Sequence, residues 1–218
     1  MSYYPSTYTG TDVATDIKRT FGDEAGVQIT DSDIIRWIDI GQLEILKNTQ
    51  ILKATSTSDL IVGQTVYSLA SLKILKIQAI HVNGSPIPFI SFQESEQYVA
   101  PNDPTNIASG TPQVWTEWAG NIHLYPASSV TVSGGLSIFY LPAPAKLAQL
   151  SDSLSIPDTY YNDLINFVLS KAYELDEDPQ NSQFKLGQFT QSLDGMANNE
   201  NIPQVAYYPV ITVLPEDE

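Results

Sequence analysis

The sequence predicts an α+β protein, in which a helical bundle carries an inserted small antiparallel β-sandwich or barrel and is followed by an extended C-terminal arm. Three observations predict this fold class. Apolar residues recur at helical spacing before residue 50 and again after residue 157. Between these segments, short alternating runs are separated by turn residues. The last twenty residues are apolar but contain three prolines. We expect an N-terminal helical part, a β-domain, a C-terminal helical part and an arm at residues 1–53, 54–150, 151–198 and 199–218.

The N-terminal part contains signals for two helices. Thr11 or Asp12 can cap a short first helix, and Gly22 can end it because glycine tolerates a left-handed backbone. A longer second helix is expected from residues 30–33 (TDSD), which resemble a capping box. Gly41 lies in the apolar stripe of this helix, where glycine costs roughly 1 kcal/mol relative to alanine. We therefore expect another element to pack closely against Gly41.

The β-domain contains signals for short strands and tight turns. Asn83-Gly84 predicts a hairpin, Gly120-Asn121 a second turn, and Gly134-Gly135 a bend before the last strand. One or two helical turns are expected within residues 91–99, whereas residues 101–112 are predicted to form a loop. The expected strands cover residues 55–57, 65–69, 74–82, 86–89, 114–118, 122–126 and 136–141.

Two more helices are expected in the C-terminal part. Helical spacing returns at Pro157, a residue suited to the first position of a helix, and the pattern ends at the acidic residues 174–178. A final helix is expected over residues 181–197. Its apolar seam is expected to contain Leu186, Phe189, Leu193 and Met196.

The residue types that carry catalysis or bind metals are scarce. The chain has no cysteine, which excludes disulfides, thiol catalysis and cysteine zinc sites. His81 and His123 are the two histidines, and both fall in expected strands, where a structural role is favoured over metal ligation. There is no glycine-rich phosphate loop, and the acids at 174–178 lack the spacing of a calcium loop. We interpret those acids as a solvated helix end, although a basic partner would also explain them. The sequence thus predicts no catalytic residue, no cofactor and no metal.

The net charge of −15 is unevenly distributed along the chain. Residues 77–218 contain three bases against sixteen acids. Such a surface disfavours binding to nucleic acid and to anionic membranes, because phosphates are bound by clustered Lys and Arg. The charge favours solubility, or alternatively a surface that must not attract DNA. The sequence shows no apolar run near ~20 residues and no secretory signal, so we expect a soluble protein kept in the cytoplasm.

The arm is too apolar for an ordinary disordered tail. An apolar strand without its own sheet commonly adds to the edge of another sheet, so we predict that the arm binds a neighbouring subunit or a partner. Packing back on its own domain is the alternative. The predicted partner-binding residues are Tyr207, Tyr208, Val210, Ile211, Val213 and Leu214.

The order of several motifs resembles a known family. Residues 29–38 (ITDSDIIRWI) open a long helix, and they are followed by 63–69 (GQTVYSL), 110–112 (GTP) before an aromatic strand, 122–126 (IHLYP), and 156–157 (IP) before a Tyr-rich helix ending in 172–174 (AYE). In this order they resemble the head-to-tail connector (adaptor) proteins of tailed bacteriophages. The resemblance spans roughly residues 11–195 and does not include the arm.

The resemblance implies a structural virion protein, assembled in the host cytoplasm as a homo-oligomeric ring, with twelve as the expected number of copies. Its implied partners are other copies of itself, the phage portal protein, and a tail or nozzle protein. It also implies a passive channel for DNA ejection, without enzymatic activity, specific nucleic-acid binding or membrane binding. We add the hypothesis that the acidic surplus lines this channel, through which DNA slides without sticking.

Two other classes of function remain open at this point. Trp115, Trp118 and Tyr125 lie near one another on a predicted hairpin, which suggests a carbohydrate-binding β-module. Exposure of these aromatic residues around a concave patch would favour that alternative, and burial would favour the connector. A hydrolase would need a pocket with converging carboxylates, which sequence cannot reveal because such pairs are not local.

Overall fold

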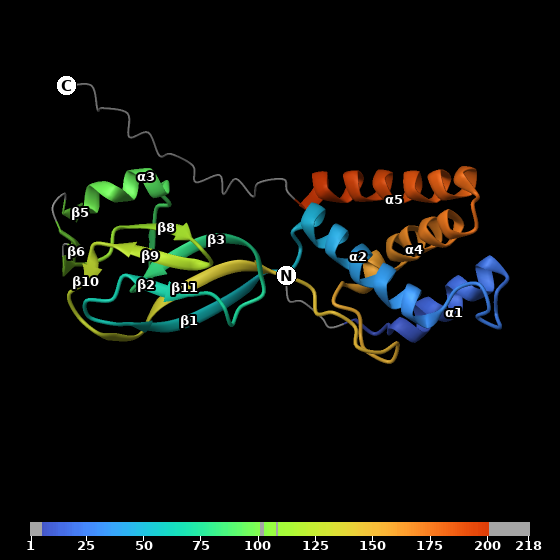
Figure 1. Cartoon of the computed structure of the whole chain (residues 1–218), viewed down its shortest axis with the longest axis horizontal. Coiled ribbons are helices and arrows are strands. Elements are labelled where there is room, and N and C mark those ends of the chain that lie inside the picture. Colours follow the sequence, from blue (N-terminus) through green and yellow to red (C-terminus); the bar gives the residue numbers. More distant parts are fainter. Residues whose placement is uncertain (1–5, 101–102, 108, 201–218) are drawn as a thin grey trace, which may run out of the picture.

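The computed structural model describes residues 6–100, 103–107 and 109–200. Helices and strands segregate into two parts that lie end to end, with the strands on the left and most of the helices on the right in Figure 1. Each part contains its own cluster of buried apolar side chains. The predicted α+β class is confirmed, whereas the boundaries of the four predicted parts stay predictions. Within the described ranges, no helix is both long and apolar enough to cross a bilayer.

The helical part consists of four helices around the larger cluster: α1 (Gly10–Phe21), α2 (Asp31–Thr49), α4 (Tyr161–Leu175) and α5 (Pro179–Glu200). The predicted end of α1 is confirmed, because Gly22 adopts a left-handed conformation with φ of 84°. Its predicted start is wrong by a few residues. Thr9, not Thr11 or Asp12, caps α1, because the Asp12 carboxylate accepts a hydrogen bond from the Thr9 backbone N–H at 2.7 Å and completes a capping box.

The start of α2 and the contact at Gly41 are as predicted. The Thr30 side chain accepts a hydrogen bond from the backbone N–H of Asp33, so Thr30 caps α2. A Cβ atom on Gly41 would lie 2.6 Å from Leu164 Cδ1 and 2.8 Å from Phe167 Cδ1, both on α4. The expected close packing is therefore that of α4 on α2, which the absence of a side chain at Gly41 permits.

The first residue of α4 and the buried side of α5 both differ from the prediction. Pro157 precedes a 3₁₀ turn, η2 (Asp158–Tyr160), and α4 begins only after it. The predicted apolar seam of α5 is also wrong in part. Phe189 is buried, but Leu186 is 41% exposed. The side of α5 that faces α4 carries Lys185, which donates a hydrogen bond to Asn166 of α4. The side chain of Met196 lies outside the described part, and Leu193 is buried as expected.

The strand-rich part is a sandwich, and its described strands do not form a closed barrel. A four-stranded antiparallel sheet has the order β1-β11-β3-β4, and a three-stranded antiparallel sheet has the order β2-β9-β8. Both sheets contribute side chains to the second buried cluster. These strands are β1 (Ala54–Leu60), β2 (Val66–Ser68), β3 (Ile74–Val82), β4 (Ser85–Ile87), β8 (Val114–Trp118), β9 (Asn121–Tyr125) and β11 (Val132–Pro142).

The turns of this part confirm one prediction and correct two. Asn83 and Gly84 have φ of 50° and 82° and join β3 to β4 in the predicted hairpin. The turn between β8 and β9 uses Ala119 and Gly120, one residue earlier than predicted. Gly134-Gly135 lies within β11 instead of preceding it, and a Cβ atom on Gly135 would lie 3.1 Å from the Leu60 Cβ of neighbouring β1.

The prediction of a loop over residues 101–112 is wrong in its middle section. β6 (Asp103–Ile107) pairs antiparallel with β5 (Val99–Ala100). β7 (Ser109–Gly110) pairs parallel with β10 (Ala127–Ser128), the one parallel pair among the described sheets. The Pro, Asn and Gly residues of this segment favour turns locally, but backbone pairing with other segments overrides that preference. A short helix, α3 (Phe92–Ser95), and a 3₁₀ turn, η1 (Glu96–Tyr98), confirm the expected helical turns just before it.

The chain passes between the two parts at two neighbouring points. It enters the strand-rich part at β1 and leaves it at the end of β11. These two strands are paired, with Ala54 opposite Tyr140. Both connections are therefore at the same end of the four-stranded sheet.

The loop between α1 and α2 depends on one buried carboxylate, and this dependence predicts a pH effect. Asp23 accepts backbone hydrogen bonds from Val27, Gln28 and Ile29 at 2.8–2.9 Å. These bonds, with that of Ile29 foremost, lower the pKa of Asp23 below its ordinary value of 3.8. The stabilisation is therefore fully present above pH 3.8 and is lost as the pH falls through the lower folded-state pKa.

We expect Asp23→Ala to lower the free energy of unfolding at pH 7, because three backbone N–H groups, among them the buried one of Ile29, lose their acceptor. The difference from the wild type should shrink when the pH is taken below 3.8. Urea unfolding followed by circular dichroism at both pH values measures this. The control is Glu24→Ala, since Glu24 is exposed and adjacent. Equal effects of the two substitutions would contradict the proposed role of the Asp23 carboxylate.

Candidate interaction surfaces

The described residues do not assemble a metal centre. No group of three or more His, Asp or Glu side chains among them has the geometry to hold a metal ion. Two surface cavities, of about 570 and 360 Å³, are each lined by a single carboxylate, Asp194 and Asp59 respectively. Burial lowers the pKa of His123, which keeps it neutral at pH 7, and His81 packs against Phe139 with ring centroids 4.6 Å apart. A hydrolase with two converging carboxylates finds no support in these cavities.

The acids at the end of α4 have partly structural roles. Glu174 forms an ion pair with Lys171 at 2.7 Å. Asp178 caps α5, because its carboxylate accepts hydrogen bonds from the backbone N–H of Asn181 at 3.1 Å and from the Asn181 side-chain amide at 2.6 Å. The Asn181 bonds lower the pKa of Asp178. Asp178, one of the acids that we predicted to be solvated at the end of α4, thus caps the start of α5.

Three aromatic side chains beside β8 are exposed, namely Phe89, Phe92 and Trp118, and we call the stacked pair Phe92 and Trp118 the aromatic patch. The three side chains are 58%, 37% and 54% exposed. The Phe92 and Trp118 rings stack with centroids 4.4 Å apart, and Phe89 meets the buried Trp115 edge-on at 4.9 Å. The patch lies where α3 packs on β8. Exposed, contiguous aromatic rings of this kind are typical of binding surfaces.

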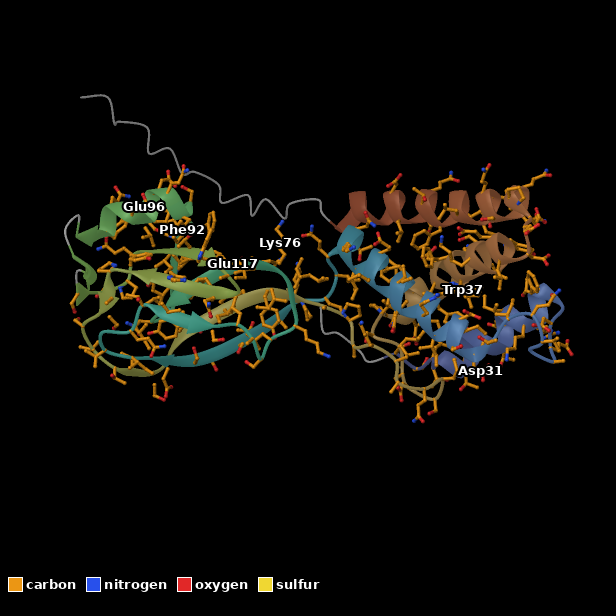
Figure 2. The ribbon with its side chains drawn as sticks, in the orientation of Figure 1. Asp31, Trp37, Lys76, Phe92, Glu96 and Glu117 are labelled. Carbon is orange, nitrogen blue, oxygen red and sulfur yellow. The ribbon has the colours of Figure 1, made fainter. Side chains whose placement is uncertain are left out.

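The surroundings of the aromatic patch are acidic. Residues 77–142 contain no Lys or Arg. The exposed carboxylates of Glu94, Glu96 and Glu117 come from the same two elements or the turn that follows α3, and Figure 2 shows Glu117 and Phe92 on the side of the sandwich where α3 lies. Hydrogen bonds from the Ser91 backbone and hydroxyl lower the pKa of Glu94, so it is ionised at neutral pH. The patch therefore suits a partner that is apolar and positively charged.

The aromatic residues singled out from the sequence separate in the structure. Trp115 and Tyr125 are buried, 6% and 5% exposed, whereas Trp118 is on the surface. Sequence reasoning missed Phe89 and Phe92. The signal available for Phe92 was the capping box formed by Ser91 and Glu94, which fixes α3 beside β8.

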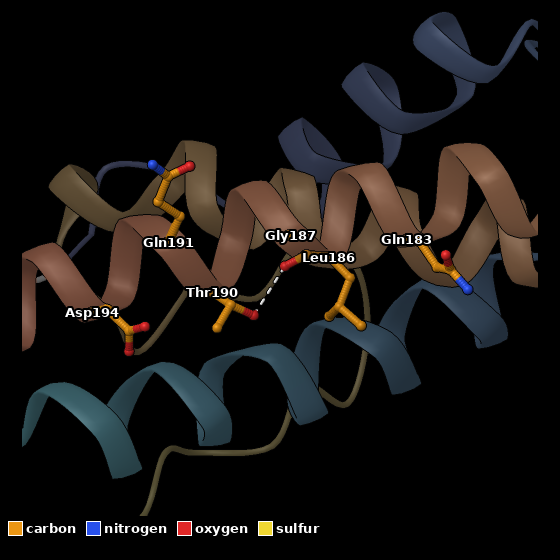
Figure 3. A pocket seen from close by; sticks show the side chains of 6 residues that line it. All are labelled: Gln183, Leu186, Gly187, Thr190, Gln191 and Asp194. Atoms are coloured by element: carbon orange, nitrogen blue, oxygen red, sulfur yellow. Dashed lines mark hydrogen bonds between the residues drawn. The ribbon is translucent and has the colours of Figure 1, made fainter.

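A second exposed surface follows the outer side of α5. Three large apolar side chains of the two C-terminal helices are exposed: Leu175 at the end of α4, and Phe184 and Leu186, which are two residues apart and so point to different sides of α5. Figure 3 shows the shallow cavity beside Leu186, lined by Gln183, Leu186, Gly187, Thr190, Gln191 and Asp194. A Cβ atom on Gly187 would meet nothing within 4 Å. This face is thus open and partly apolar.

A third feature is a groove of about 360 Å³ on the open side of the sandwich, between β1 and β2. Its apolar surface comes from Tyr67, Leu72 and Ile138, and polar side chains of β1 line the rest. The groove follows the outer edge of β1, which has no neighbour on that side among the described strands.

The comparison with known families decides between the classes of function considered above. The family model described as SU10 adaptor protein matches residues 8–212. The chain belongs to the SU10 adaptor protein family. This is a family of phage head-to-tail adaptors, so the adaptor is a structural protein of a bacteriophage and part of the virion, as the resemblance implied. No curated protein matches the adaptor.

The predicted partner-binding residues of the adaptor lie outside the described residues. They are Tyr207, Tyr208, Val210, Ile211, Val213 and Leu214. The family match extends to residue 212 and so includes most of the arm. Their role in binding stays a prediction.

Proposed function

We propose that copies of this adaptor form a ring that joins the portal to the tail and lets the genome pass. The observation that carries the proposal is the match of the adaptor family to residues 8–212. Each copy also exposes two apolar surfaces on different parts of the chain, the aromatic patch and the outer face of α5. Two different surfaces on each copy suit head-to-tail contacts, which close into a ring when the rotation between copies is regular.

The charge of the adaptor supports a passive channel. The net charge is −15, and residues 77–218 contain sixteen acids against three bases. Four of the bases of the described residues are already paired with carboxylates, namely Lys18, Arg36, Lys47 and Lys171. A lumen of such subunits repels the DNA backbone instead of binding it. We propose that the acidic surplus faces the lumen and that no bond is made or broken by the ring.

The ring of the proposal contains twelve copies, the number that the resemblance to connectors implies. Its neighbours are the portal protein on one side and a tail or nozzle protein on the other. The arm residues named above are proposed to hold a neighbouring copy or one of these partners.

The carbohydrate-binding alternative loses most of its basis. It depended on Trp115, Trp118 and Tyr125 presenting their faces together, and only Trp118 is exposed. The Trp118 ring is stacked on Phe92, which occupies one of its two faces.

Mass measurement in native solution tests the proposed ring. The purified adaptor, with a subunit mass of 24.0 kDa, is measured alone and after mixing with its portal protein. We expect a closed multiple of the subunit mass in the mixture, and electron microscopy should show a ring in which the acidic residues face the lumen. A single adaptor chain in both samples would contradict the proposal, and so would a lumen lined by bases.

A further inference from the structure

The four-stranded sheet has one long edge that nothing covers within the described ranges. β1 spans seven residues, and its backbone forms hydrogen bonds to β11 alone. The other edges of the two larger sheets are short or blocked. β4 and β2 have three residues each, β4 contains Pro86, and β8 is covered by residues 88–90 through a bond from the Trp115 N–H to the Pro88 carbonyl at 3.1 Å. A long, unpaired edge is a template for another strand.

The groove beside β1 has the shape and chemistry for an extended chain. It follows Ser56, Thr57 and Ser58 of β1, and its floor carries the apolar side chains of Tyr67 and Ile138. A strand added to β1 would therefore place one of its faces on apolar side chains and the other toward solvent, as alternating side chains of a strand require. Its backbone would pair with the free edge.

The C-terminal arm contains a segment that matches this groove. Residues 210–214 (VITVL) are five uncharged, mostly β-branched residues between Pro209 and Pro215. In an extended conformation Ile211 and Val213 share one face, and Thr212 lies on the other. We infer that residues 210–214 of a neighbouring copy pair with β1 as a fifth strand, with Ile211 and Val213 in the groove. This inference rests on the proposed ring.

A neighbouring copy is the occupant because of where the arm starts. The arm begins after α5, which runs along the upper side of the helical part in Figure 1, whereas β1 lies at the lower side of the strand-rich part. In a ring, the opposite sides of adjacent copies face each other, so the α5 side of one copy, from which the arm starts, can face the β1 side of the next.

The cysteine-free sequence allows a direct test by cross-linking. Two single-cysteine variants of the full chain, T57C on β1 and T212C on the arm, are mixed, assembled with the portal protein and treated with a short bis-maleimide. We expect a cross-linked dimer from the mixture and a ladder of multimers from the T57C/T212C double variant. The matched control replaces T57C with S85C on the short edge β4 and should give neither product. Adding I211D to the T212C chain should abolish the dimer, because it places a charge in the apolar groove.

The outcomes separate this inference from the proposed function. Rings that form without a T57C–T212C cross-link would overturn the inference and leave the ring intact. A cross-linked monomer from the double variant, with no dimer from the mixture, would overturn it in favour of docking on the same chain. Cross-linking of S85C to the same extent as T57C would also overturn it. Failure to form any ring with the portal would overturn the proposed function and the inference together.

Discussion

Replacing Phe167 with alanine is expected to lower the free energy of unfolding by about 3–5 kcal/mol. Phe167 lies at the centre of the helical cluster and is 5% exposed. Its ring packs against Phe189 of α5 with centroids 5.1 Å apart and lies over Gly41 of α2. Truncation therefore leaves a cavity where three helices meet. Urea unfolding followed by far-UV circular dichroism measures the change.

Phe184→Ala is the matched control for this prediction. The same atoms are removed, but Phe184 is 60% exposed on the outer side of α5, so the change is expected to stay within about 0.5 kcal/mol. A loss of similar size in both variants would contradict the assignment of Phe167 to the core. The control also has a use in assembly experiments, because it alters the proposed interface without weakening the bundle.

The second large effect is expected from Gly41→Val. The first added carbon would lie within 2.6–2.8 Å of Leu164 and Phe167, and the two further methyl groups have no space between α2 and α4. We expect a loss at the upper end of the range of about 1–3 kcal/mol that overpacking typically costs. The midpoint of urea unfolding measures this loss.

Gly187→Val provides the comparison at an open position. Gly187 is also inside a helix, but a Cβ atom there meets nothing within 4 Å. The two substitutions have the same intrinsic effect on helix formation, so the difference between them isolates the contact of α2 with α4. If Gly41→Val were no more destabilising than Gly187→Val, the close approach of the two helices would be wrong.

The features that could be predicted from the sequence are those that depend on neighbouring residues. The cap at Thr30, the stop at Gly22 and the hairpin at Asn83-Gly84 each require only a few consecutive residues. Gly41 was predictable for another reason. A glycine within an apolar stripe is unfavourable in a helix, and close packing offsets that cost.

The features that could not be predicted depend on residues distant in the chain. The strand at Ser109–Gly110 exists through its pairing with Ala127–Ser128, although its residues favour turns. Trp115 and Trp118 are three residues apart in one strand and point to opposite faces, and only the face of Trp115 is buried, because the other sheet packs on it. The aromatic patch was therefore partly missed, whereas the apolar character of the arm was evident from composition alone.

The paired position of β1 and β11 has an evolutionary consequence. Because the chain enters and leaves the sandwich at adjacent points, Ala54 and Tyr140, removing that part leaves a gap in the helical frame that a short link can close. Recombination between phage genomes can then replace the sandwich by an unrelated insert while the helices keep their mutual packing. Diversity among such proteins is accordingly expected to concentrate between these two points.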